Sequence, residues 1–125
     1  MRKCYFLILL LLLILTSCEN KITEEYLIGG EWVAIAGYKD GEVKGDPNCD
    51  PFEKGNEFRS EDTVYNRTYG EDVRYEIIDD GFEIVFTFKN IGTYRYQIKM
   101  ISNNELVLEG IGVGSEGHSC YMERK

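Results

Sequence analysis

Positive charge and histidine are both scarce in this chain of 125 residues, and each scarcity argues against a class of function. Lysine and arginine number 14 against 22 aspartate and glutamate, so the formal net charge is −8. This deficit argues against a nucleic acid partner, because binding to phosphates requires a basic surface. The single histidine, His118, gives little support to a Ser-His-acid triad, and no glycine-rich phosphate loop follows a strand. We therefore expect neither an enzyme nor a bound cofactor.

A long hydrophobic run is also missing. The apolar stretch begins at Tyr5, behind Arg2 and Lys3, and ends at Leu15. About 20 apolar residues are needed to cross a bilayer, so this run is too short for a transmembrane helix. A basic start, a short apolar core and small residues before a cleavage point are typical of a secretory signal peptide. We therefore predict a leader, with an uncleaved N-terminal anchor as the alternative.

The residues that close this run resemble the lipobox of bacterial lipoproteins, in which the cysteine becomes the first residue of the mature chain. They are Leu15-Thr16-Ser17-Cys18. The resemblance implies a lipoprotein: residues 1–17 leave as the signal peptide, and Cys18 carries a diacylglyceryl thioether and an N-acyl chain such as palmitate. Two or three acyl chains hold a small domain firmly at a membrane. We expect a cell-envelope protein at the outer membrane, its periplasmic or surface face left open; an ordinary signal peptide with a chance cysteine is the alternative.

Two cysteines remain once Cys4 leaves with the leader and Cys18 is acylated, namely Cys49 and Cys120. An exported chain with two thiols in an oxidising compartment favours a disulfide between them. Closing a loop of about 70 residues stabilises a fold by about 4 kcal/mol in the chain-entropy model. No C-x-x-C spacing is present, so we expect a structural bridge; a reactive or metal-binding cysteine is the alternative.

The predicted mature chain, residues 18–125, has 12 basic and 22 acidic side chains once Arg2 and Lys3 are removed, a net charge of −10. Its length suits one domain. Residues 18–28 are expected to hold the lipidated cysteine, a polar tether and one helical turn, which Gly29 and Gly30 terminate. Residues 29–125 then form the folded domain.

Alternating apolar and polar residues dominate the rest of the chain. From 82 to 88, for example, three phenylalanines and Ile84 share one face. A period of two with one polar face predicts half-buried antiparallel strands, and short Asp-Gly and Asn-containing turns between them predict a meander. The fold class is therefore all-β, an up-and-down meander that closes into a small barrel because an open sheet would leave unpaired edges; a two-sheet β-sandwich is the alternative. The segments with this pattern are 32–38, 63–69, 73–77, 82–89, 94–100, 105–108 and 119–124.

Gly30-Glu31-Trp32, at the start of the first predicted strand, resembles the G-x-W motif of lipocalins. In that family the tryptophan plugs one end of the barrel and a late arginine packs across it, a position that Arg124 matches. The chain as a whole resembles the small lipocalin-like lipoproteins of Bacteroidetes, which share the lipobox, an L-x-G-x-W start, a Y-x-I strand (here Tyr96–Ile98), an E-L-x-L strand (here Glu105–Leu108) and a closing C-Y strand. The resemblance implies a lipocalin-like barrel that binds a small apolar molecule.

An eight-stranded barrel is just wide enough to be filled by its own side chains or to hold one small ligand. If it holds a ligand, we expect aromatic residues from several strands to line the site, two of them tyrosines that offer polar contacts. The expected lining residues are Trp32, Tyr65, Tyr75, Phe82, Phe86, Phe88, Tyr94 and Tyr96. A filled barrel is the alternative, and the short strands and large rings favour it. Function would then reside on the acidic surface, which suits a basic protein partner such as lysozyme.

One acidic loop has the spacing of a calcium site. Oxygen ligands at positions 1, 3, 5 and 12 suit Ca²⁺, but Pro51 stands where an EF-hand requires glycine, and no helical pattern flanks the loop. We therefore favour a solvated loop and no metal site. The four residues with this spacing are Asp46, Asn48, Asp50 and Glu57.

Asp62-Thr63-Val64 resembles a signal for O-glycosylation in Bacteroidetes. The resemblance implies a glycan on Thr63; the alternative is the ordinary start of a strand.

Overall fold

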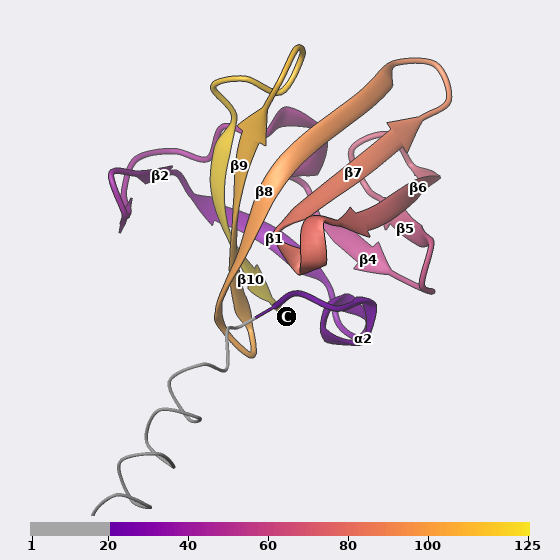
Figure 1. The fold of residues 1–125 in the computed structure, drawn as a ribbon, viewed down its shortest axis with the longest axis horizontal. Coiled ribbons are helices and arrows are strands. Elements are labelled where there is room, and N and C mark those ends of the chain that lie inside the picture. Colours follow the sequence, from indigo (N-terminus) through magenta and orange to yellow (C-terminus); the bar gives the residue numbers. More distant parts are fainter. Residues whose placement is uncertain (1–20) are drawn as a thin grey trace, which may run out of the picture.

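Eight antiparallel strands close into a barrel in the computed structural model, which describes residues 21–125 (Figure 1). The order around the barrel is β1-β10-β9-β8-β7-β6-β5-β4, so most chain neighbours are also hydrogen-bonded neighbours. The predicted all-β meander is confirmed, and the sandwich alternative is wrong. The predicted signal peptide and Cys18 lie outside the described residues. The barrel strands are β1 (Trp32–Ala36), β4 (Asn56–Phe58), β5 (Thr63–Asn66), β6 (Glu71–Ile78), β7 (Glu83–Phe88), β8 (Gly92–Ser102), β9 (Glu105–Ile111) and β10 (Ser119–Arg124).

Side-chain alternation produces the barrel wall. In β7, Ile84, Phe86 and Phe88 are buried, and Thr87 between them is exposed. Tyr96 on β8 lies opposite Ile84 in the register, so apolar side chains from neighbouring strands meet on the inner face. Period-two burial of this kind fixes the register, because a slip of one residue would turn every phenylalanine outward.

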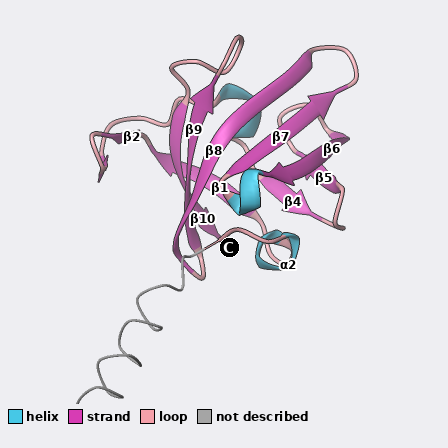
Figure 2. Ribbon diagram, viewed as in Figure 1, coloured by secondary structure: helices cyan, strands magenta, loops and turns pink. Residues whose placement is uncertain are grey.

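A two-stranded hairpin, β2 (Tyr38–Lys39) and β3 (Glu42–Val43), stands outside the barrel. Its turn residues Asp40 and Gly41 both have positive φ, 53° and 78°, as a type I′ turn requires. This is an Asp-Gly turn of the kind that the sequence analysis expects between strands. Figure 2 shows how little helix accompanies the strands, namely α2 (Glu24–Leu27) and the 3₁₀ turns η1 (Asp50–Phe52) and η2 (Asp79–Gly81).

The barrel has two unlike ends. We call the end at which the described chain begins the proximal rim; it comprises residues 28–31, 59–62, 79–82 and 103–104. We call the opposite end the distal rim; it comprises residues 37–55, 67–70, 89–91 and 112–118. Figure 1 shows α2 and the C-terminus together at the proximal rim.

The proximal rim is closed by the helical turn predicted before the glycine pair. Thr23 caps α2, its hydroxyl accepting a hydrogen bond from the backbone N–H of Tyr26 at 3.2 Å. Trp32 is fully buried beneath α2 and donates from Nε1 to the carbonyl of Leu27 at 2.9 Å. The Arg124 guanidinium lies 4.5 Å from the centre of the indole, which is the arrangement that the lipocalin resemblance implied.

Gly30, in the G-x-W motif, cannot carry a side chain. Its φ is +71°, and an added Cβ would lie 2.8 Å from both Cγ of Arg124 and the carbonyl oxygen of Lys125. The glycine therefore lets Arg124 approach the tryptophan.

Candidate functional site

The interior of the barrel is filled by its own side chains. An apolar void of about 10 Å³ remains between residues that include Trp32, Phe86 and Met122. This volume is about that of a single water-sized sphere, whereas small-molecule sites enclose roughly 300 Å³ or more. The barrel in this conformation has no room for an apolar ligand.

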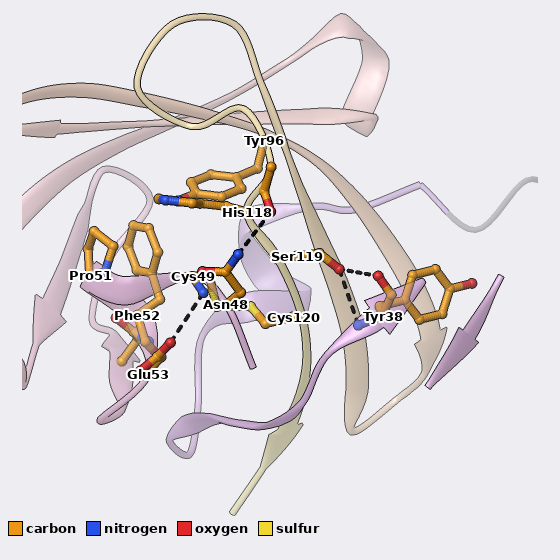
Figure 3. Close-up of a disulfide and its surroundings, with 12 residues drawn as sticks. Tyr38, Asn48, Cys49, Pro51, Phe52, Glu53, Tyr96, His118, Ser119 and Cys120 are labelled. Carbon is orange, nitrogen blue, oxygen red and sulfur yellow. Dashed lines mark hydrogen bonds between the residues drawn. A yellow bond between two sulfur atoms is a disulfide. The ribbon is translucent and has the colours of Figure 1, made fainter. Parts of the chain in front are cut away.

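Phe52 completes the filling of the interior. Unlike the other core aromatic residues around it, this residue comes from a loop and not from a strand. Its ring, 1% exposed, lies 4.3 Å from the ring of Phe86, 5.8 Å from that of Phe88 and 5.5 Å from that of Tyr96 (centroid distances). Figure 3 shows Phe52 beside Pro51 with Tyr96 nearby. We call residues 44–55 the plug loop, because this segment brings a side chain into the distal opening of the barrel.

The predicted disulfide holds the plug loop in place. Cys49 and Cys120 form a bridge, both fully buried, which joins the plug loop to β10 (Figure 3). Next to it, Asn48 and Ser119 exchange two backbone hydrogen bonds of 3.0 and 2.7 Å. The plug loop is thus attached to the last strand by a disulfide and by backbone hydrogen bonds. Both cysteines are used in the bridge, so the alternative of a reactive or metal-binding cysteine does not apply.

Two buried asparagines form a second attachment. The side-chain amide of Asn56 donates to the carbonyl of Phe52 at 2.9 Å, and that of Asn66 donates to the carbonyl of Pro51. Asn66 also donates to Oδ1 of Asn56 at 3.0 Å and accepts from the backbone N–H of Tyr69 at 3.0 Å. Burying an amide is costly unless it is hydrogen-bonded. The hydrogen bonds that satisfy the two asparagines therefore also hold the plug loop in position.

Most of the predicted lining residues do point into the barrel. Trp32, Tyr75, Phe86, Phe88 and Tyr96 are buried, and Tyr94 is partly buried against them. These aromatic residues contact one another and Phe52, so they form a packed core.

Tyr65 is placed differently from the prediction. On β5, Val64 and Asn66 are the buried positions, so Tyr65 between them lies on the outer wall, where the guanidinium of Arg59 sits 4.4 Å from its ring centre. The sequence favoured an inward tyrosine, but the paired asparagine amides take the inner face.

Phe82 is also placed differently. The turn at 79–81 has positive φ at Asp79 and Asp80, and β7 begins only at Glu83. Phe82 therefore lies at the proximal rim, 43% exposed, and does not line the interior.

His118, the only histidine, closes the distal rim beside the plug loop. Its Nδ1 lies 2.9 Å from the hydroxyl of Tyr96, and its ring is stacked on those of Tyr94 and Tyr96. Burial raises the pKa of Tyr96 well above its ordinary value, so the phenol stays neutral in this contact. Sequence reasoning considered His118 only as a member of a Ser-His-acid triad and did not predict these contacts.

The structure does not gather the residues with calcium-loop spacing. The amide of Asn48 donates to the carbonyl of Gly117 at 3.0 Å, and Glu57 lies on β4 with its carboxylate 3.6 Å from Arg59. Within residues 21–125, no group of three or more His, Cys, Asp or Glu side chains is placed to hold a metal ion.

Thr63, the predicted glycan acceptor, lies partly exposed at the start of β5. Its hydroxyl donates to the carboxylate of Asp62 at 3.0 Å, and that of Ser60 donates to the same oxygen at 2.9 Å. These two hydrogen bonds lower the pKa of Asp62. Glycosylation stays a prediction.

An open hollow between the proximal rim and the outer wall of β6 and β7 gathers acidic side chains. Its volume is about 600 Å³, and four carboxylates face one guanidinium, so its formal charge is −3. Tyr75, buried on the inner side of β6, borders the hollow, and its hydroxyl donates to the carbonyl of Ser60 at 2.6 Å. Burial, with the nearby negative charges, raises the pKa of Tyr75 to about 12. We call this the acidic hollow; it is lined by Glu24, Glu61, Asp62, Arg74, Tyr75, Glu76, Val85 and Thr87.

Among residues 21–125, no helix has both the length and the apolar character to cross a membrane. Comparisons with family models, with curated proteins and with solved structures find no match. The kinship with lipocalin-like lipoproteins therefore stays a prediction that the sequence motifs carry, while the barrel and the disulfide are features of the structure.

Proposed function

We propose that this chain is a lipid-anchored envelope protein whose barrel serves as a rigid scaffold, and that it binds a basic protein through the acidic hollow. One observation carries the choice. The interior has about 10 Å³ free, whereas the hollow on the outer wall offers about 600 Å³ of open space beside four carboxylates. A partner in solution can reach the second site and not the first.

The anchor in this proposal is the lipid on Cys18. Its support is the lipobox-like end of the apolar run, together with the absence of a run long enough to span a bilayer. Removal of residues 1–17 would leave the acylated cysteine at the start of the mature chain, at the outer membrane and with a lipocalin-like barrel behind it.

The charge of the mature chain supports a basic partner. A net charge of −10 attracts a cationic protein over a distance of about a Debye length, and the hollow concentrates part of that charge in one concave surface. Complementary charges raise association rates and select partners more than they raise affinity. We therefore expect binding that weakens with salt.

The test measures the affinity of the protein for lysozyme, used as a defined basic protein, at low and at physiological ionic strength. The variant Glu61→Gln with Glu76→Gln removes two charges from the hollow. Its control, Asp40→Asn with Glu42→Gln, removes two charges from the hairpin at the distal rim. We expect a loss of about tenfold for the first variant, since each charge is worth up to about 1 kcal/mol, and a loss of at most about twofold for the control.

Equal losses in both variants would show that net charge alone attracts the partner and that the hollow is not the site. No binding at low salt would overturn a lysozyme-like basic partner.

A separate measurement addresses the small-ligand alternative. Native mass spectrometry after exposure to envelope lipid extracts should detect no bound molecule, because Phe52 occupies the interior. A retained small-molecule mass that disappears in the variant Phe86→Asp, with the fold intact, would instead favour a carrier of an apolar molecule.

A further inference from the structure

We infer that the proximal rim rests on the surface of the membrane that holds the lipid anchor, with Phe82, Ile101 and Ile28 at headgroup level. The partner is thus a lipid surface, and the inference depends on the proposed acylation of Cys18. Two features of the chain support it, namely the length of the tether and the exposed apolar side chains, and the charge of the rim limits its depth in the membrane.

The tether is short. Ile22 is 2% exposed and its backbone N–H donates to the carbonyl of Gly81 at 3.3 Å, so from this residue onward the chain is attached to the barrel. Cys18 and Ile22 are four peptide units apart, which limits the distance between their Cα atoms to about 14 Å. The proximal rim must therefore lie close to the lipid attachment point, whatever path residues 19–21 take.

The rim that is held there carries exposed apolar side chains. Phe82 is 43% exposed after the turn at 79–81, Ile101 is 42% exposed at the end of β8, and Ile28 is 36% exposed after α2. Each belongs to a segment at the end of the barrel where α2 packs: Tyr26 of α2 donates to the carbonyl of Ser102, next to Ile101. Aromatic and aliphatic side chains of this kind are favourable where acyl chains meet headgroups.

The charges on the proximal rim limit how deeply it can enter the membrane. The proximal rim as defined above carries five acidic side chains and one basic side chain, Arg59, while Lys21 and Lys125 lie next to it. The five acidic residues are Glu31, Glu61, Asp62, Asp79 and Asp80. The rim is therefore acidic, so charge does not draw it to an anionic surface, and the lipid anchor must hold it there. The carboxylates must stay hydrated. The apolar side chains consequently reach the headgroup region and no deeper.

This orientation places the two rims at different heights. Strand β8 has 11 residues. At about 3.3 Å per residue and a tilt of about 40°, it raises the distal rim roughly 28 Å above the proximal rim. Val113, 98% exposed in the distal loop at 112–118, then lies well outside the membrane. The acidic hollow extends from the proximal rim, to which Glu61 and Asp62 belong, onto the side wall formed by β6 and β7.

The experiment compares two single tryptophan substitutions in the full acylated chain, Phe82→Trp at the proximal rim and Val113→Trp at the distal rim. Both sites are exposed, and the native Trp32, fully buried, is common to both variants. Each protein is reconstituted in vesicles of phosphatidylethanolamine and phosphatidylglycerol, with and without lipid brominated near the top of the acyl chain. Bromine quenches only indoles in its vicinity.

We expect brominated lipid to lower the emission of Phe82→Trp by about twofold relative to Val113→Trp, since an interfacial side chain penetrates by about 5–10 Å. Equal emission in the two variants, with the acyl chains present, would overturn the seating of the rim and leave the anchor intact. The mass of the N-terminal peptide, measured on the same samples, reports the acylation of Cys18. An unmodified Cys18 would overturn the anchor and, with it, this inference.

Discussion

The plug loop makes a strong prediction about the substitution Phe52→Ala. The ring is fully buried and packs against three aromatic rings at 4.3–5.8 Å. Truncation of a buried phenylalanine costs about 3–5 kcal/mol, through lost transfer free energy and the cavity left behind. Three aromatic contacts, each worth about 0.5–1.5 kcal/mol beyond the buried area, place the expected loss near 4 kcal/mol. For a domain of about 100 residues this lowers Tm by roughly 15 °C or more.

Denaturation followed by the fluorescence of Trp32 measures this loss directly. The control is Phe82→Ala, which removes the same atoms from a 43% exposed site and should cost no more than about 1 kcal/mol. In addition, benzene should stabilise Phe52→Ala and leave the native protein unaffected, because an apolar cavity of that size stays dry and accepts such a ligand. Similar losses at positions 52 and 82, or no response of Phe52→Ala to benzene, would refute the view that Phe52 fills the barrel.

Three other outcomes are expected. Replacing both Cys49 and Cys120 by serine should lower the free energy of unfolding by about 4 kcal/mol, measured in denaturant, and a loss below about 1 kcal/mol would show that hydrogen bonds alone hold the plug loop. Arg124→Lys should lose about 1–2 kcal/mol, since a lysine cannot cover the indole and bond several carbonyls at once; thermal melts against the wild type measure this. Hydroxyl donors, of which Tyr121 contributes most, hold the pKa of Glu105 below its ordinary 4.5. A lowered carboxyl pKa stabilises the fold above the unfolded value and loses that effect as pH falls through the folded one. Tyr121→Phe should therefore be destabilised at pH 7 and match the wild type more closely below about pH 4 in parallel urea titrations; a pH-independent difference would contradict this.

The wall of the barrel was predictable because its causes are local. Alternation from Ile84 to Phe88, the Asp40-Gly41 turn and the glycines before Trp32 each act within a few residues, so they can be identified from the sequence. The disulfide was predictable for another reason: with Cys4 assigned to the predicted leader and Cys18 to the predicted lipid, predicted export to an oxidising compartment left one pair, Cys49 and Cys120.

The residue that completes the filling of the barrel could not be predicted in the same way. Phe52 follows Pro51 in a loop, where no periodicity indicates which side chain is buried. Its position depends on contacts between segments far apart in the sequence, such as the bond from Asn66 to the plug loop. Those contacts also explain Tyr65, which lies on the outer wall because Asn66 occupies the inner face. Propensity and hydrophobicity favour the tyrosine inside, and the amide network outweighs them.

The same network bears on where a partner can bind. A molecule that entered the barrel would have to displace Phe52 and break the amide hydrogen bonds to the plug loop. If displacement costs the roughly 4 kcal/mol expected for Phe52→Ala, the affinity of that molecule is weakened about a thousandfold. The acidic hollow carries no such penalty, because its side chains already face solvent and the barrel behind them stays closed. Binding on the outer wall therefore requires no rearrangement of the core, and we expect a partner to bind without a measurable loss of protection in the amides of β7 and β8.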